Sequence, residues 1–446
     1  MSTPRPKGQT TDDRRRTTAI DSSSPVSLSA VSSSAAIARP LSVVRRLSSV
    51  VRQTDWRVSG VLLAWLFGLW ALAWATIAWS GMAPDFVGDP SAARFTQEYE
   101  PLWLYVWTRW DGQWYLNITY GGYGFIPYDA PFFPMYPMLA AGVRAVTTLP
   151  VAAAGLIVSY ACLALGLIYL YKLARLDFER GTTVRAIITL LLYPTAFFLV
   201  AMYTESLVLL LTSSALYYAR VAKWWLVAPI ALMAGLSKIM AVALVVALTC
   251  EALLGEANSP EGREGKRWGA LLRPRALLSR LTPAKVVALI AAPAGLLLYM
   301  GFLAWRFGDA FSFINALPVR FWRGRFSFFE QEWRLVSSWF QRGMTLNDWS
   351  KVGDFVAFLL MLGMAVYAAR CMRLSYAALT VTFLVLLVLS GDLLSLNRYI
   401  LTVAPVFIGI AAIASRRPIA WAVMLALFVP LQAYFAVRFF LWGWVA

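Results

Sequence analysis

The chain has 446 residues, of which 60% are hydrophobic and only 14% are charged. Soluble globular domains contain about 45–50% apolar and about 25% charged residues. The apolar excess is gathered in runs of about 20 residues, the length needed to cross a bilayer. This composition excludes a soluble enzyme, a secreted disulfide scaffold and a disordered chain. The net charge of +17 indicates basic cytoplasmic loops in a membrane protein, and we expect no nucleic-acid partner.

The sequence contains no histidine. A histidine general base, a Ser–His or Cys–His nucleophile and a His-ligated metal are therefore excluded. The three cysteines, Cys162, Cys250 and Cys371, lie in or beside apolar runs without metal-ligand spacing, so we expect them to be buried small hydrophobic side chains. Catalysis must then depend on carboxylates and cations. We expect no cofactor; a divalent cation is compatible with the sequence, but no motif marks a site for one.

The chain divides into two parts. Residues 1–55 are rich in Ser, Thr, Pro and Arg without apolar periodicity, which predicts a disordered basic cytoplasmic tail. Residues 56–446 form the membrane domain, and its first span, Val58 to Met82, is longer than a signal-peptide core. The tail places the N-terminus inside, so the polar and aromatic segment 81–150 is a large first extracytoplasmic loop.

The remaining apolar runs predict an all-α integral membrane bundle with about eleven transmembrane helices. Basic residues between the runs fix the orientation, because short cytoplasmic loops carry the Lys and Arg excess. This rule places 255–284 inside and 306–351 outside, and it favours an interfacial or re-entrant position for 131–148 over a full span. The run 224–254 is too long for one crossing, and we expect two short helices that meet at Gly235-Leu236-Ser237-Lys238.

The densest polar and aromatic motif is RWDGQWY, residues 109–115. Aromatic faces stack on the C–H faces of a sugar ring, and a carboxylate can accept a hydroxyl proton. Asp111 is the candidate base, and Gly112 permits a tight turn beside it. The alternative is an interfacial aromatic belt with one solvated aspartate. The other substrate-binding candidates from this region are Arg109, Trp110, Trp114, Tyr115 and Tyr136.

Three further signals lie at predicted helix ends. Glu205, next to Tyr203, falls between two apolar runs, where an ionisable group is expensive and suggests function; the alternative is a carboxylate at a hairpin tip. Lys238 lies at the helix break, where irregular backbone lines a cavity or the lysine only caps a hairpin. Arg398, next to Tyr399, can clamp a phosphate with its planar guanidinium or act as an interfacial anchor.

All four signals lie at outer helix ends in a topology that was fixed from inside charges. A base, a second carboxylate and two cations on the outer side suggest an enzyme that acts on a lipid phosphate. Four of the arginines in the outer loop 306–351 are notable because they lie on a side where few cations are expected. They either gather an anionic lipid phosphate or contact ordinary anionic headgroups. These are Arg320, Arg323, Arg325 and Arg342.

The motifs RWDGQWYL, APFFPMYP, LYPTAFFLVAMYTESL and LNRYIL, in this order over roughly residues 105–405, resemble the PIG-V-type GPI mannosyltransferase family and its bacterial relatives. That family belongs to the GT-C superfamily of polytopic glycosyltransferases. Two features depart from the family pattern. Leu236-Ser237-Lys238-Ile239 replaces a Thr-Arg-Pro-like element, which keeps a cation without the guanidinium, and the long basic tail 1–55 is additional.

The resemblance implies a GT-C-like helical bundle and an inverting hexosyl or mannosyl transfer from a polyprenol-phosphate-linked sugar on the extracytoplasmic face. Asp111 matches the family's catalytic aspartate. Arg398 and Lys238 are the candidates for stabilising the leaving phosphate, and Glu205 would orient the acceptor or hold a cation. The acceptor is a lipid-linked glycan, another glycolipid or a protein. Membrane lipids are the other partners, and in a bacterium the location is the plasma membrane.

Two other classes compete with this interpretation. A transporter or flippase of a lipid-linked sugar also uses broken helices and buried charges. Against it, no repeat symmetry is visible, and the conspicuous polar residues gather on one side rather than at mid-membrane. A non-catalytic membrane scaffold is the third class, and it predicts that Asp111 can be replaced without loss of activity.

Overall fold

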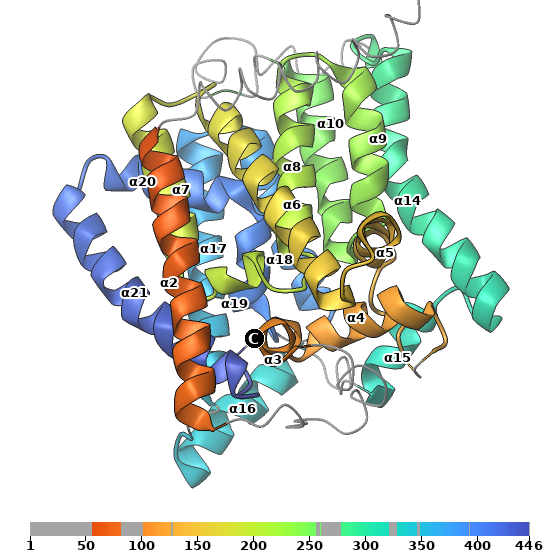
Figure 1. The fold of residues 1–446 in the computed structure, drawn as a ribbon. Coiled ribbons are helices and arrows are strands. Elements are labelled where there is room, and N and C mark those ends of the chain that lie inside the picture. The colour runs from red at the N-terminus through yellow and green to blue at the C-terminus, as the bar shows by residue number, and fades with distance from the viewer. Residues whose placement is uncertain are drawn as a thin grey trace, which may run out of the picture. The chain divides into compact units, whose positions relative to one another are not determined.

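The computed structural model describes residues 56–81, 101–125, 128–255, 259, 278–320, 328–345, 348–391 and 393–445. These residues belong to one compact unit, Val51–Ala446, and within these ranges the regular elements are all helices (Figure 1). The all-α fold class is therefore confirmed. The predicted disordered tail and most of the predicted cytoplasmic loop 255–284 lie outside the described residues.

Among the described residues, five helices are long and apolar enough to cross a membrane, or six if one bent pair counts as a single span. The predicted count of eleven is not confirmed. The bent pair is Leu396–Thr402 followed by Ala404–Ala414, with 84° between its halves. The five long helices are α2 (Trp56–Ser80), α6 (Val151–Ala174), α14 (Pro283–Phe307), α17 (Asp348–Cys371) and α21 (Pro418–Phe440).

Several predicted spans are instead short or interrupted. The apolar run from Val184 to Met202, which the sequence predicts as one of the spans, consists of most of α7 (Arg180–Leu192) and the short 3₁₀ helix η2 (Ala196–Leu199), separated at Tyr193 and Pro194. A proline disfavours helical backbone in the residue before it, and Tyr193 is extended with ψ 141°. The remaining apolar helices of 10–17 residues are α9 (Trp224–Gly235), η3 with α10 (Ile239–Leu254) and α18 (Leu374–Leu389).

The apolar stretch at 131–148 forms α5 (Met135–Thr147). A helix of this length covers about 20 Å, less than the hydrocarbon thickness of about 30 Å. It is not among the candidate spans of the described residues, and it packs against α6. The predicted break near residue 236 is confirmed, because α9 ends at Gly235 and η3 begins at Ile239.

Small residues let the helices that carry the site approach one another closely. A Cβ atom at Gly235 would overlap the carbonyl oxygen of Ala292 on α14, and one at Gly295 would overlap that of Leu232 on α9. Such glycine contacts bring helix backbones together where lipid supplies no hydrophobic drive between them. The α9–α14 contact therefore fixes where α9 ends, and with it the position of Lys238.

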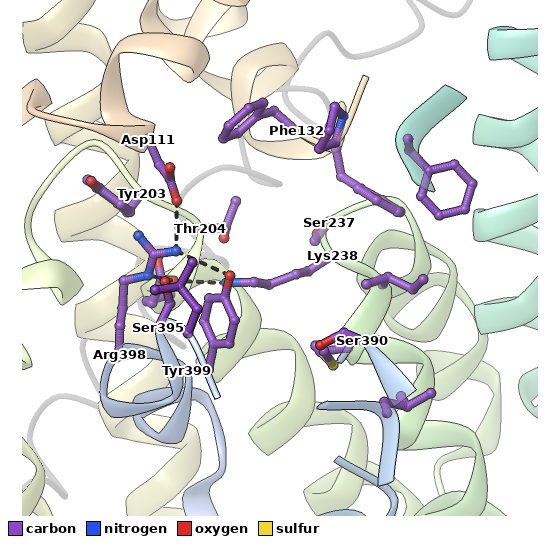
Figure 2. Close-up of a pocket in the computed structure, with 18 of the residues that line it drawn as sticks. Asp111, Phe132, Tyr203, Thr204, Ser237, Lys238, Ser390, Ser395, Arg398 and Tyr399 are labelled. Atoms are coloured by element: carbon purple, nitrogen blue, oxygen red, sulfur yellow. Dashed lines mark hydrogen bonds and ion pairs between the residues drawn. The ribbon is translucent and has the colours of Figure 1, made fainter. Parts of the chain in front are cut away.

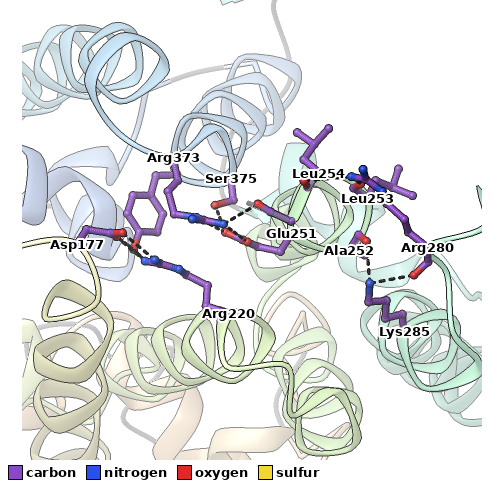
Figure 3. Close-up of polar contacts among 12 residues, drawn as sticks. Asp177, Arg220, Glu251, Ala252, Leu253, Leu254, Arg280, Lys285, Arg373 and Ser375 are labelled. Carbon is purple, nitrogen blue, oxygen red and sulfur yellow. Dashed lines mark hydrogen bonds and ion pairs between the residues drawn. The ribbon is translucent and has the colours of Figure 1, made fainter. Parts of the chain in front are cut away.

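The end of α8 (Glu205–Arg220) remote from Glu205 is held by a polar cluster, shown in Figure 3. Arg220 forms a two-pronged ion pair with Asp177 and donates to Tyr376 Oη at 3.1 Å. Nearby, Arg373 binds both carboxylate oxygens of Glu251, at 3.1 and 2.8 Å. Breaking such a buried pair by removing one partner costs about 3–5 kcal/mol.

Cations also satisfy the last carbonyl groups of α10. Arg280 donates to the carbonyl oxygen of Leu253 at 2.8 Å, and Lys285 donates to that of Ala252 at 2.9 Å (Figure 3). Positive charge at a helix C-terminus is stabilising because carbonyl groups there have no partner within the helix. All of these basic residues lie in or near segments that the sequence predicts to be cytoplasmic.

The cysteine prediction is partly wrong. Cys162 is buried, but Cys250 is half-buried and Cys371 is exposed. Cys371 is the last residue of α17, where the chain turns toward α18. Its position at a helix end explains the exposure.

Candidate active site

A cavity of about 500 Å³ lies where α4 (Asp111–Gly121), α8, η3, α18 and α19 (Leu396–Tyr399) meet. Its charged lining residues are Asp111, Glu205, Lys238 and Arg398, and Figure 2 shows Asp111 and Arg398 pointing toward one another. The sequence proposed these four as separate signals, and the fold brings them to one place. Their catalytic roles remain predictions.

Arg398 is the central residue of this charge cluster. Its Nη2 donates to Asp111 Oδ2 at 2.7 Å, and its Nε lies 3.2 Å from Glu205 Oε1. Lys238 Nζ donates to the same Glu205 oxygen at 2.9 Å. The side chains of Arg398 and Glu205 are 3% and 1% exposed, whereas Asp111 is 27% exposed. Asp111 is therefore the carboxylate most open to an incoming hydroxyl group.

Three buried atoms in this cluster have no hydrogen-bond partner among the described residues: Nε and Nη1 of Arg398 and Oε2 of Glu205. Nε still lies within ion-pair distance of Glu205 Oε1, which leaves Nη1 and Oε2 for a ligand. Leaving a buried polar group unsatisfied costs about 1–3 kcal/mol, and more for a charged group. An anion beside Arg398 Nη1 and a hydroxyl donor beside Glu205 Oε2 would satisfy both atoms. The protein therefore offers one unused cationic donor and one unused anionic acceptor to a ligand.

The turn that presents Asp111 is tied to the segment before Glu205. Tyr203 Oη donates to the carbonyl oxygen of Arg109 at 2.7 Å, and the Met202 N–H donates to that of Trp107 at 3.0 Å. A Cβ atom at Gly112 would lie 3.3 Å from the Tyr203 ring, tighter than an ordinary contact. Glycine at position 112 therefore lets the turn that carries Asp111 pack against the segment before Glu205.

Arg398 is positioned by a set of hydrogen bonds around its neighbour Asn397. Asp354, buried on α17, accepts the backbone N–H groups of Asn397 at 2.7 Å and Ser395 at 3.3 Å. Tyr193 Oη donates to Asn397 Oδ1 at 2.8 Å, and Thr195 Oγ1 donates to the Asn397 carbonyl oxygen at 2.5 Å. The bend between α7 and η2 thus holds the arginine-bearing turn.

Asp354 was missed by sequence reasoning. An aspartate within the apolar segment VGDFVAFLL is itself a signal, because an ionisable group inside a membrane span is costly and is usually retained for function. Lys238 was predicted, and its position follows from the break after α9. Its Nζ lies 3.9 Å from the centre of the Tyr399 ring, which provides a cation–π contact.

Six predicted residues besides Asp111 line the cavity, and four do not. The lining set is Tyr115, Tyr203, Glu205, Lys238, Arg398 and Tyr399. The residues outside it are Arg109, Trp110, Trp114 and Tyr136. Their positions do not support the expectation of direct substrate contact, because each packs behind the cavity surface.

The contacts of three of these residues explain their positions. Arg109 is fully buried between the rings of Tyr105 and Trp442. Trp114 stacks in parallel on Phe132, with 5.1 Å between ring centres, and Phe132 lines the cavity in its place. Tyr136 Oη donates to the Gly155 carbonyl oxygen at 2.8 Å. The sequence identifies the motif, but it does not show which of the aromatic rings in the motif faces the cavity.

The outer-loop arginines are only partly described. Arg342 forms a two-pronged ion pair with Asp348, both distances being 3.0 Å, so its charge is already matched within the protein. Arg323 and Arg325 lie outside the described residues, as does the side chain of Arg320. Among the described residues, no group of three His, Cys, Asp or Glu side chains comes together to hold a metal ion.

Comparison with known proteins finds a family match over part of the chain. Apolar helices around a buried charge cluster define a membrane protein with an enclosed polar site. Residues 79–256 match the family model described as Mannosyltransferase (PIG-V). Over this region, about two fifths of its length, the chain is similar to the PIG-V-type mannosyltransferase family, which supports a glycosyltransferase activity. The match contains Asp111, Glu205 and Lys238, whereas Arg398 lies beyond it. Neither the curated proteins nor the solved structures yield a match.

Proposed function

We propose that this protein is an inverting mannosyltransferase that moves a hexose from a polyprenol-phosphate-linked donor to an acceptor hydroxyl group. The observation that carries the proposal is the Arg398 guanidinium, which lies between Asp111 and Glu205 in a largely apolar cavity with one donor atom unused. A buried guanidinium is suited to a phosphate, which it can bind with two parallel hydrogen bonds. The apolar lining suits an isoprenoid chain.

The proposed step is a single displacement. The acceptor oxygen attacks the anomeric carbon from the side opposite the phosphate, the bond from that carbon to the phosphate oxygen breaks, and Asp111 takes the hydroxyl proton. The phosphate leaves with the bonding electron pair, and Arg398 and Lys238 stabilise the charge that develops on it. Because phosphate is a good leaving group near neutral pH, no strong general acid is required. Glu205 holds the two cations in place.

We place the reaction on the extracytoplasmic face. The cavity begins at the Glu205 end of α8, and the basic cluster with Arg220 lies at the other end, about 23 Å away along the helix. Basic residues mark the cytoplasmic side of membrane proteins, which supports an outward-facing cavity. In a bacterium the membrane would be the plasma membrane.

The test uses protein purified in detergent. A labelled polyprenyl-phosphate mannose is incubated with the protein and a mixed pool of glycolipid, lipoglycan and peptide acceptors. We expect labelled product whose new linkage has the anomeric configuration opposite to that of the donor, and we expect none with Asp111→Asn. Because no sealed compartment is present, transport cannot produce this signal. Retention of the donor's configuration would contradict the single displacement, and intact donor would contradict the proposed activity.

A further inference from the structure

The chain segment after α21 packs on the turn that presents Asp111. Arg109 Nε donates to the Phe440 carbonyl oxygen at 3.3 Å, and Trp110 Nε1 donates to that of Gly443 at 3.3 Å. The Arg109 guanidinium also lies over the Trp442 ring, 4.7 Å from its centre. Segments more than 300 residues apart in the sequence therefore form one structural unit at the edge of the cavity.

Backbone geometry shows that this unit is held under strain. Trp110 and Trp442 have φ values of 55° and 62°, in the left-handed region that bulky residues rarely adopt. Such residues persist only where the surroundings fix them, and they concentrate at functional sites. The two strained residues contact each other edge to face, with 5.7 Å between ring centres. The strained backbone at both residues therefore suggests that this contact has a functional role in addition to packing.

Trp444 is the aromatic residue that this unit places in the cavity. It lines the same cavity as Asp111, and it is only half-buried. Its ring meets that of Trp110 edge to face, with ring centres 5.0 Å apart, so Trp110 supports it from behind. An indole face offers a flat apolar surface for the C–H face of a sugar ring. Trp444, rather than a tryptophan of the motif at residues 109–115, is therefore the tryptophan placed to stack on a sugar.

We infer that the segment Leu441–Val445 forms part of the acceptor subsite and that Trp444 stacks on a sugar ring of the acceptor. The inference rests on the proposed function. Trp444 contacts the residue next to Asp111, the base for the acceptor hydroxyl, whereas Lys238 and Tyr399 lie together around the proposed phosphate position. An acceptor that needs an aromatic platform is a glycan, carried by a lipid or a lipoglycan, rather than a serine or threonine side chain of a protein.

The kinetic test compares Trp444→Ala and Trp444→Phe with Trp79→Ala. Trp79 is 81% exposed on α2 and does not line the cavity, so its loss controls for removal of a tryptophan. We expect Trp444→Ala to lower kcat/KM for a glycan acceptor about 10-fold through a higher acceptor KM. Its donor KM should change much less than its acceptor KM, because the proposed phosphate position lies around Lys238 and Tyr399. Trp444→Phe should retain activity within about 3-fold, because a flat ring remains.

Several outcomes would overturn this inference while the proposed function stands. One such outcome is that Trp444→Ala transfers the sugar as fast as Trp79→Ala and the wild type do. Another is that Trp444→Ala raises the donor KM and the acceptor KM by the same factor. Transfer to a peptide hydroxyl without any effect of Trp444→Ala would exclude a glycan acceptor. Donor left intact by the wild type would instead contradict the proposed function.

A second measurement does not depend on turnover. Trp444→Cys, in a chain whose three native cysteines are replaced by serine, is labelled with a maleimide in the presence and absence of excess mannotriose. Mannotriose should slow labelling at position 444 and leave a Trp79→Cys control unchanged. Equal labelling rates with and without the sugar would refute a glycan subsite at Trp444, whatever the reaction catalysed.

Discussion

The Asp354 carboxylate accepts the backbone N–H of Asn397 at 2.7 Å, although 43 residues separate the two along the chain. This contact connects α17 to the turn that carries Arg398. Gly353 allows the approach, because a Cβ atom there would lie 2.7 Å from Asn397 Nδ2. Asp354 is therefore a positioning residue for Arg398.

We predict that Asp354→Asn lowers kcat about 10-fold, because an amide group cannot accept both backbone N–H groups as a carboxylate does. The same change in an Arg398→Ala background should have less than about a 2-fold further effect, since the residue it positions is gone. Turnover of the four proteins at saturating donor checks this. Equal factors in both backgrounds would indicate a general structural role instead.

Asp111→Asn keeps the shape of the side chain but removes its basicity. General-base catalysis contributes about 10²–10⁴-fold, and we expect a loss of kcat in this range or larger. Expression and elution as a single species should be unchanged, because Asp111 is the most exposed of the two cavity carboxylates. Activity within a few-fold of wild type would remove Asp111 as the base.

Arg398→Lys should be severely impaired despite retaining the charge. The guanidinium reaches Asp111 with Nη2 and Glu205 with Nε, and an ammonium group on a flexible chain cannot reproduce this planar arrangement. We expect at least about a 10-fold loss for Arg398→Lys and about 10²–10³-fold for Arg398→Ala in donor-saturated turnover. Arg334→Lys is the matched control, since Arg334 pairs with Glu330 at an exposed position, and it should remain near wild type. Equal, small effects at both positions would leave Lys238 as the candidate phosphate cation.

Orientation in the membrane can be measured in intact cells. In a chain without native cysteines, Glu179→Cys lies in the exposed turn between α6 and α7, and Met344→Cys lies in the exposed segment before α17. A membrane-impermeant maleimide should label position 344 and spare position 179 until the cells are permeabilised. The reverse pattern would place the cavity on the cytoplasmic face.

Asp129 makes a pH-dependent contribution to stability. Burial raises the pKa of Asp129 to about 6, although its carboxylate accepts the Gly124 N–H. Since the folded protein binds this proton more tightly than the unfolded chain does, the stability contributed by Asp129 rises as pH falls from about 6 toward 4. We expect the Tm of the wild type minus the Tm of Asp129→Asn, both measured in detergent, to increase as the pH is lowered from about 6 to 4. A difference that stays constant with pH would show that Asp129 does not titrate there.

The sequence predicted the helical membrane fold and the four charges of the cavity for a physical reason. Charges such as Glu205 and Lys238 in apolar surroundings are costly, so they stand out against the local composition. The predicted count of eleven spans was not confirmed. Hydropathy reports which segments are apolar, but it does not report where the backbone bends within them. The 84° bend after Thr402 leaves the apolar pattern uninterrupted, and it is visible only in the structure.

Residues that depend on long-range packing could not be identified from local pattern. Trp444 is identified by its ring contact with Trp110, and Asp354 by the hydrogen bond that it accepts from Asn397. No local pattern in the sequence connects the members of either pair. Conversely, Trp110 and Trp114 belong to the most conspicuous motif, yet neither ring lines the cavity: Trp110 packs against Trp444 and Trp114 against Phe132.

The sharing of Arg398 between two carboxylates has a consequence for timing. With Lys238, the cluster contains two positive and two negative groups, so their formal charges balance. A phosphate that draws the guanidinium toward itself would release Asp111 Oδ2 from its hydrogen bond with Arg398 Nη2. Binding of the donor would thus free the oxygen that must accept the proton of the acceptor hydroxyl group, whereas before the donor binds that oxygen is held by the guanidinium.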